Sequence, residues 1–328
     1  MTRCAQLFIV FLAALGAALP NVGHAEAAWP RETLRVVVPF APGGLTDVIG
    51  RTLAQELAKS LKVPAIVENR SGAFGLVGTE YVAQAKPDGH TLLVGGGIVA
   101  LADALYPKLR FDPRKDLVPV AMIERNGLLL VATKANERFA GASLPQILGW
   151  AREQPGSIAV ASFGSGSISH MALETLKTAG RVDLLHVPYR GTAPAMPDVI
   201  GGQVPMMIDN TVTALPQVRA GKIHAIAYTG KERLAQLPDV PTFTELGLPQ
   251  LQIYNFFGLY VPAGTPATVA ERLNAEVNRI FRQPEVVAKF AEMGAELHPG
   301  SASAFSAFLE GERSRWGQLI RSQGIRPE

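Results

Sequence analysis

The sequence contains very little cysteine and comparatively little charge. Its single cysteine, Cys4, stands almost at the N-terminus, so the rest of the chain has no thiol for a disulfide, a cysteine-ligated zinc or a nucleophile. Charged residues make up 18% of the 328 residues, below the roughly 25% of an average soluble protein, whereas hydrophobic residues reach 48%. This composition excludes a disordered, collagen-like or low-complexity chain.

Long runs of one charge are also absent. The 31 Lys and Arg residues and 28 Asp and Glu residues give a net charge of +3, and they are scattered along the chain. No basic cluster of the kind that binds nucleic acid is present, so we expect no nucleic-acid partner. The length predicts about two domains, each large enough to bury its own core.

The one long apolar run lies at the N-terminus. It follows Arg3, extends from Ala5 to Leu19, and is followed by small residues at 23–27. This order is typical of a secretory signal peptide, and the run is shorter than the roughly 20 residues of a membrane-spanning helix. We predict a signal peptide over 1–27, cleaved near Ala25 to Ala28, and a periplasmic mature protein. The alternative is an N-terminal anchor that is not cleaved.

Apolar strands and amphipathic helices alternate along the rest of the chain. Thr33–Phe40 has the composition of a buried strand, and after a glycine-rich turn a helix follows from about Asp47. The pattern predicts further strands at 65–68, 91–94, 158–162, 184–187, 206–208 and 224–228. It predicts further helices after 72–78, at 145–152, 169–179, 194–200 and 215–220, from an N-cap at Thr265 followed by Pro266, and around Phe305 to Leu319. This alternation favours an α/β fold with a parallel sheet covered by helices on both faces.

The number of strands is too large for one small sheet, and no linker rich in Gly, Ser or Pro divides the chain. Two lobes joined by more than one crossing strand satisfy both observations. The candidate crossing strands are the long extended runs 118–133 and 252–261.

Two glycine-rich turns are candidates for an anion-binding site. The first turn is Pro42–Asp47 and the second is Gly72–Gly78, and each lies between a predicted strand and a predicted helix. Ligands of open parallel sheets bind at such positions, where glycines allow close approach and free N–H groups at a helix start attract an anion. The structural alternative is that the glycines only form turns and Asp47 only caps a helix.

Motifs of enzymes are less well matched than the anion-binding turns. Gly95–Ala100 matches G-x-G-x-x-G/A by letter, but the region around Asp112 and Asp116 does not supply the strand-end carboxylate of a dinucleotide site. The run 162–167 contains no serine with glycine on both sides at the spacing of a nucleophile elbow. No metal-ligand spacing is found among His90, His170, His186, His224 and His298. We therefore expect no catalytic residues, no metal and no cofactor.

Several motifs in order resemble the Bug family, the TctC-type extracytoplasmic solute receptors of tripartite tricarboxylate transporters. The resemblance extends over essentially the whole chain after the signal peptide. It rests on the segments 38–47 with Arg51, 68–78, 86–93, 164–167 with His170, 186–191, 202–204, 208–210 and 258–266.

The resemblance implies a type II periplasmic-binding-protein fold, in which two Rossmann-like lobes joined by crossing strands close on a small carboxylate. It implies one lobe of residues 28–125 plus 255–328 and a second lobe of residues 126–254. The implied contacts of the first lobe are Phe40, Gly43, Gly44, Thr46, Asp47, Ala73 and Gly75. Those of the second lobe are Ser165, Tyr189, Gly191, Asp209 and Asn210.

Three residues depart from the family pattern. Phe74 stands where a small residue is usual, Leu45 where a polar residue or proline is frequent, and Phe256 where tryptophan is common. Phe74 belongs to the expected binding site, where its ring either narrows the cleft or offers a stacking face to an aromatic acid.

The expected function is a periplasmic solute-binding receptor, a monomer, that delivers a small organic carboxylate to inner-membrane permease subunits by hinge closure. Two alternatives remain open: a receptor that presents its ligand to a sensor kinase, and an exported α/β enzyme that uses the Gly95 turn or the Ser165 region.

Overall fold

The computed structural model describes residues 29–106 and 108–326. The predicted signal peptide and its cleavage site lie outside the described residues. Within them, no helix is long and apolar enough to cross a membrane.

The described residues form nine strands in one continuous sheet. The strands are β1 (Leu34–Val38), β2 (Ala65–Asn69), β3 (Thr91–Gly96), β4 (Leu117–Thr133), β5 (Ala159–Ser162), β6 (Leu185–Pro188), β7 (Met206–Asn210), β8 (Ile223–Tyr228) and β9 (Tyr254–Pro262). Their order is β2-β1-β3-β9-β4-β7-β5-β6, with β8 paired to β4.

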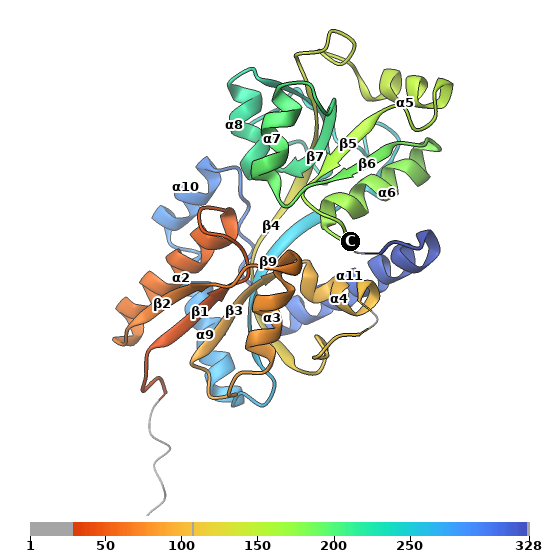
Figure 1. Ribbon diagram of the computed structural model, residues 1–328. Coiled ribbons are helices and arrows are strands. Elements are labelled where there is room, and N and C mark those ends of the chain that lie inside the picture. The colour runs from red at the N-terminus through yellow and green to blue at the C-terminus, as the bar shows by residue number, and fades with distance from the viewer. Residues whose placement is uncertain (1–28, 107, 327–328) are drawn as a thin grey trace, which may run out of the picture.

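Strand β4 divides this sheet into two halves. Its residues 117–127 pair with β9 beside β3, and its residues 128–133 pair with β7 and β8. Figure 1 shows the two halves as two lobes, with β4 and β9 running from one to the other. Both predicted crossing segments are therefore long strands that pair with each other.

The sequence pattern predicts a parallel sheet, but the sheet in the structure is mixed. Pairs β1–β2, β1–β3, β5–β6 and β5–β7 are parallel, but every pair that involves β4 or β9 is antiparallel. The reason lies in the chain path, because β4 carries the chain into the second half and β9 brings it back.

Ten α-helices and two short 3₁₀ helices of the described chain cover the sheet. The α-helices are α2 (Leu45–Leu61), α3 (Leu76–Ala83), α4 (Ile98–Leu105), α5 (Leu144–Glu153), α6 (Ile168–Gly180), α7 (Thr192–Ile200), α8 (Thr211–Arg219), α9 (Ala267–Ile280), α10 (Pro284–Glu292) and α11 (Ala302–Gln323). The 3₁₀ helices are η1 (Ala73–Gly75) and η2 (Pro249–Leu251).

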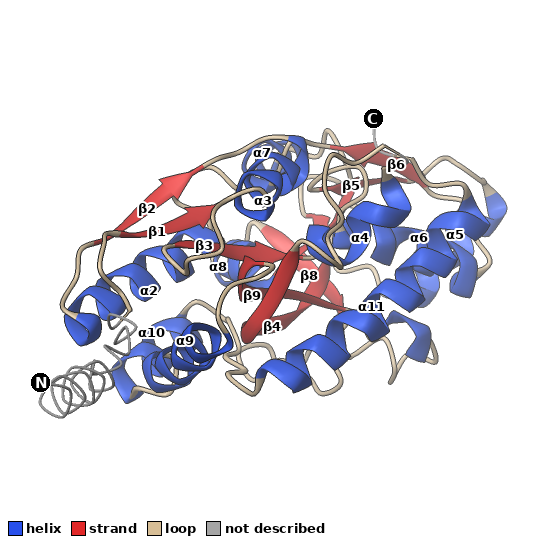
Figure 2. Ribbon diagram, turned by 90° about the horizontal axis from the view of Figure 1, so that it is seen from below, coloured by secondary structure: helices blue, strands red, loops and turns tan. Residues whose placement is uncertain are grey.

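The unbroken apolar sequence of β1 follows from burial on both of its faces. Val36 packs in a core with α2, α9 and α10, whereas the neighbouring Val37 packs in a second core with α3, α4 and the first half of α11. Figure 2 shows α2 and α9 on one side of β1 and β3 and α3 on the other. Because side chains alternate along a strand, a strand between two helical layers needs apolar residues at successive positions.

Five helices differ from the sequence-based expectation. Helix α2 begins at Leu45, and α8 begins at Thr211 with Pro216 in its interior, both earlier than predicted. The N-cap prediction at Thr265 is wrong by one position, because Pro266 occupies the cap and the Thr265 hydroxyl donates to the Pro262 carbonyl (2.7 Å). Helices α4 and α10 were not predicted; each is too short for a clear apolar period.

Helix α11 contributes to the cores of both lobes. Phe305 and Leu309 in its first half belong to the core of β1 and β3, whereas Trp316 and Ile320 in its second half belong to the core that includes β5, β7 and α6, and α11 contacts α6. The helix therefore forms a third connection between the lobes beside β4 and β9.

Candidate functional site

The turn between β1 and α2 leaves the start of this helix open. Gly43 has a φ of 95°, which glycine adopts freely, and Gly44 is the N-cap without any side-chain cap. A Cβ atom at Gly43 or Gly44 would meet nothing within 4 Å. Because the first N–H groups of a helix have no intrahelical acceptors, this start is suited to bind a carboxylate.

The Asp47 carboxylate is buried and holds this turn in place. It accepts hydrogen bonds from Gly43 N (3.0 Å), Arg51 Nε (2.8 Å) and Asn69 Nδ2 (3.0 Å), and Asn69 also donates to the Phe40 carbonyl. Burial alone would raise the pKa of Asp47, but these three donors outweigh it and hold the pKa below 3.8. The side chain is thus used within the turn, and its carboxylate stays charged.

The second glycine-rich turn adopts a strained backbone. Ala73 and Phe74 have φ values of 44° and 51°, and Gly75 follows with 93°. Left-handed conformations at residues other than glycine cost about 1–3 kcal/mol each and persist where the surrounding structure enforces them. Here the strain directs the Phe74 ring between Phe40 (5.7 Å between centroids, edge-on) and Phe163 of the other lobe (6.0 Å, stacked).

In the second lobe, the turn that carries Ser165 is supported by the buried His170 and the half-buried His186. Gly166 N donates to Nδ1 of His170 (3.1 Å), and the His170 ring stacks on His186 at 3.9 Å between centroids. His186 Nε2 lies 2.7 Å from Oγ of Ser162. Burial, and to a smaller extent His170, lower the pKa of His186 to about 4, so this ring is neutral at physiological pH.

Tyr189 and Gly191 lie before the start of α7. The Tyr189 hydroxyl donates to Oδ2 of Asp198 (2.6 Å), and burial together with Asp198 raises its pKa to about 12. Gly191 is the N-cap of α7, has a φ of 111°, and offers no side-chain cap. A Cβ atom there would meet nothing within 4 Å, so the start of α7 is open in the same way as the start of α2.

Asp209 and Asn210 end β7 below the starts of α7 and α8. Asp209 is fully buried and accepts hydrogen bonds from the hydroxyls of Thr192 and Thr213, both at 2.6 Å. Burial raises the pKa of Asp209 to about 6 despite these donors. Asn210 Oδ1 accepts a hydrogen bond from Nδ2 of Asn255 on β9 (2.8 Å).

We expect Asp209 to lower stability as the pH rises between about 4 and 6. The native state keeps the proton up to about pH 6, whereas the unfolded state releases it near 3.8, so the native state binds more protons in this window. The rise of the Asp209 pKa from 3.8 to about 6 corresponds to a loss of about 3 kcal/mol of folding free energy at pH 7. Urea unfolding of wild type and Asp209→Asn at several pH values measures this difference. Equal pH dependence in both proteins would contradict it.

Buried polar residues of β4 were missed by sequence analysis. Neither oxygen of Glu124 and neither amide atom of Asn126 finds a hydrogen-bond partner among the described residues, although both side chains are fully buried. Asn126 stands opposite Asn255 on β9, and burial with the nearby Glu296 raises the pKa of Glu124 well above 4.5. In the sequence, Glu124 and Asn126 stand out as polar residues inside an otherwise apolar strand. In the structure they lie where β4 crosses between the lobes.

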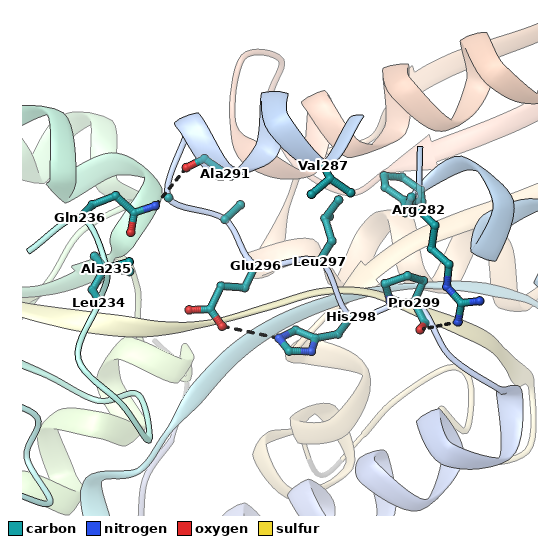
Figure 3. A pocket seen from close by; sticks show the side chains of 13 residues that line it. Leu234, Ala235, Gln236, Arg282, Val287, Ala291, Glu296, Leu297, His298 and Pro299 are labelled. Carbon is teal, nitrogen blue, oxygen red and sulfur yellow. Dashed lines mark hydrogen bonds and ion pairs between the residues drawn. The ribbon is translucent and has the colours of Figure 1, made fainter. Parts of the chain in front are cut away.

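A pocket of about 630 Å³ lies away from the expected binding residues. It is lined from one lobe by the 234–236 segment and from the other by α10 and the 294–299 segment. Figure 3 shows Gln236 donating to the Ala291 carbonyl (3.1 Å) across this pocket and His298 beside Glu296 (3.6 Å). None of the residues predicted to bind ligand lines it.

The predicted site residues fall into two groups. Phe74 and Asn210 contact the opposite lobe: Asn210 accepts a hydrogen bond from Asn255, and the Phe74 ring stacks on Phe163 and lies 3.4 Å from where a Cβ atom of Gly164 would stand. The side chains of Asp47, Tyr189 and Asp209 are instead bonded within their own lobes. These carboxylates and this hydroxyl support the turns, and the backbone N–H groups above them remain for a ligand.

The arrangement contains no exposed nucleophile paired with a base. Ser162 and His186 are in hydrogen-bonding distance, but Ser162 is fully buried under the turn. Among residues 29–106 and 108–326, no group of three or more His, Cys, Asp or Glu side chains is placed to hold a metal ion. The chemistry that the open helix starts support is binding of an anion.

Two α/β lobes joined by crossing strands, with open helix starts at strand ends in both, define the class of two-lobe solute-binding proteins. The family model of the tripartite tricarboxylate transporter family receptor (TctC) matches residues 49–325, and the chain belongs to this family. Its Bug-family resemblance is thereby confirmed.

Relatives and solved structures agree with this assignment. The chain is 33% identical to Protein BugT of Bordetella pertussis over 330 residues, which cover 99% of both chains. A structure of an R. palustris protein with adipate has a TM-score of 0.84 and 32% identity, covering 92% of this chain and 100% of that one. The structure of MatC from Rhodopseudomonas palustris with bound malate has a TM-score of 0.77 and 36% identity, covering 89% and 100%.

Proposed function

We propose that this protein is a periplasmic receptor that binds a small organic carboxylate between its two lobes and closes over it. Solved relatives were obtained with adipate and with malate, both small carboxylates, which supports this ligand class. The receptor then delivers the acid to the permease subunits of a tripartite tricarboxylate-type transporter and acts as a monomer.

The observation that carries the proposal is the pair of open helix starts. Helix α2 of one lobe and helix α7 of the other each begin at a glycine without a side-chain cap, with free space above it. Each hydrogen bond from such N–H groups to a charged carboxylate contributes about 1.5–3 kcal/mol. An acid bound by both starts would contact both lobes and would therefore stabilise the closed state.

The connection between the lobes suits a hinge. We assign residues 28–125 plus 255–328 to one lobe and 126–254 to the other, in line with the change of partners of β4 after residue 127. The hydrogen bond between Asn210 and Asn255 lies at this boundary. Because α11 belongs to the first lobe but its second half also contacts the second, we expect these contacts to change during closure.

The test is to identify the ligand that the protein carries. Freshly purified protein is denatured, released small molecules are identified by mass spectrometry, and each acid found is added back while closure is followed by small-angle scattering. We expect an unchanged organic acid that raises the melting temperature and reduces the radius of gyration. Failure to recover any acid, together with no stabilisation by added acids, would refute the proposal.

A further inference from the structure

The turns of the candidate site differ in how much free space surrounds them. At Gly43, Gly44 and Gly191 a Cβ atom would meet nothing within 4 Å. At Gly75 and Gly164 it would instead lie 3.2 Å from the Phe40 ring and 3.4 Å from the Phe74 ring. A side chain added at the first turn or at the start of α7 would meet no protein atom, whereas aromatic rings fill the region between the second turn and the Ser165 turn.

The Phe74 ring is the element that fills this region. Phe163 lies nearly parallel to it (16° between ring planes), and Phe40 lies nearly perpendicular (74°). The ring also covers the backbone of Gly164. A side chain held by rings of both lobes is not free to serve as a stacking platform for an aromatic ligand, so its bulk narrows the cleft.

The backbone supports the same interpretation. Ala73 and Phe74 are two of the four residues other than glycine with positive φ in the described chain, and they are adjacent. Glycine at position 74 would remove this strain, but it would also remove the ring that joins the lobes. The strained backbone of Phe74 is explained if its ring has a function between the two lobes.

We propose that Phe74 is a specificity-determining residue that closes one end of the cleft and restricts the ligand to short-chain carboxylic acids. The proposal rests on the proposed function, because it concerns the length of the acid bound there. An acid held by its carboxylate at the open helix starts would meet the aromatic cluster if its carbon chain extended toward the second turn. Each added methylene would then collide with the aromatic cluster.

The test compares wild type with Phe74→Gly on linear saturated dicarboxylates from malonate to suberate and on the matching monocarboxylates, by isothermal titration calorimetry. We expect wild-type affinity to fall as the chain is lengthened beyond its preferred acid. In the glycine variant, affinity for longer acids should rise by about fourfold for each methylene that enters the vacated space.

Two further variants separate the causes. Ala73→Gly relieves backbone strain next to Phe74 but keeps the ring, so it should retain the wild-type length profile. Phe74→Leu keeps apolar bulk and should still disfavour long acids. Melting temperatures establish that each variant is folded, which we expect because both glycine substitutions relieve positive φ angles.

The outcomes distinguish this inference from the proposed function. If wild type binds acids of the series and Phe74→Gly has the same length profile, the inference is wrong and the receptor function stands. If wild type binds none of these linear acids, the inference is refuted, whereas the proposed function is decided separately by the acid that the purified protein carries. A broadened profile in Phe74→Gly but not in Ala73→Gly supports the inference.

Discussion

Replacing Gly44 by leucine should reduce ligand affinity at least about a hundredfold without unfolding the protein. The position has φ −83° and ψ 172°, which any residue adopts, and a Cβ atom there meets no protein atom within 4 Å. The leucine side chain would therefore occupy only the space above the start of α2. Loss of two hydrogen bonds to a charged carboxylate, at about 1.5–3 kcal/mol each, accounts for an effect of this size.

A matched control is available on α5. Gly149 also lies where a Cβ atom would meet nothing within 4 Å, and its helix is remote from the candidate site in sequence and lies in the second lobe. Gly149→Leu should bind the ligand as wild type does. The affinity of both variants for the acid released from the purified protein is measured by calorimetric titration. Equal affinities of Gly44→Leu and Gly149→Leu would show that the start of α2 does not bind the ligand.

Much of the fold follows from the sequence because local patterns decide it. The apolar residues of β1 and the four-residue spacing of Ile49, Leu53 and Leu57 on α2 identify a strand and a helix without tertiary information. The long strands β4 and β9 were also recognisable as extended runs. Their antiparallel pairing was not, because strand direction depends on the path of the whole chain and not on local sequence.

The candidate site was predictable only in part. Glycines at strand ends marked the turns around Gly43 and Gly75, and the family resemblance implied Gly191, but the sequence could not show that the Asp47 carboxylate would bond to Arg51 and Asn69. That outcome depends on β2 bringing Asn69 beside the first turn. The contact of Phe74 with Phe163 likewise joins residues of different lobes, which no local pattern encodes.

The second large effect concerns stability and depends on α11. Trp316 is almost completely buried in the core of the second lobe, although its helix begins in the core of the first. Its Nε1 donates to Oε2 of Glu312 (2.6 Å), a half-buried carboxyl whose pKa is raised by its partial burial. Trp316→Ala would leave a cavity and deprive Glu312 of this donor.

We expect Trp316→Ala to lower the free energy of unfolding by about 3–5 kcal/mol, a large part of the 5–15 kcal/mol typical of a folded protein. Trp150 on α5 is the control, because it is only half-buried and packs edge-on against the buried Phe139. The Trp150→Ala variant should lose clearly less free energy of unfolding than Trp316→Ala. Urea unfolding followed by circular dichroism compares the two at pH 7. If Trp316→Ala is no less stable than Trp150→Ala, α11 does not tie the two cores together, and closure would have to be described with α11 belonging to one lobe alone.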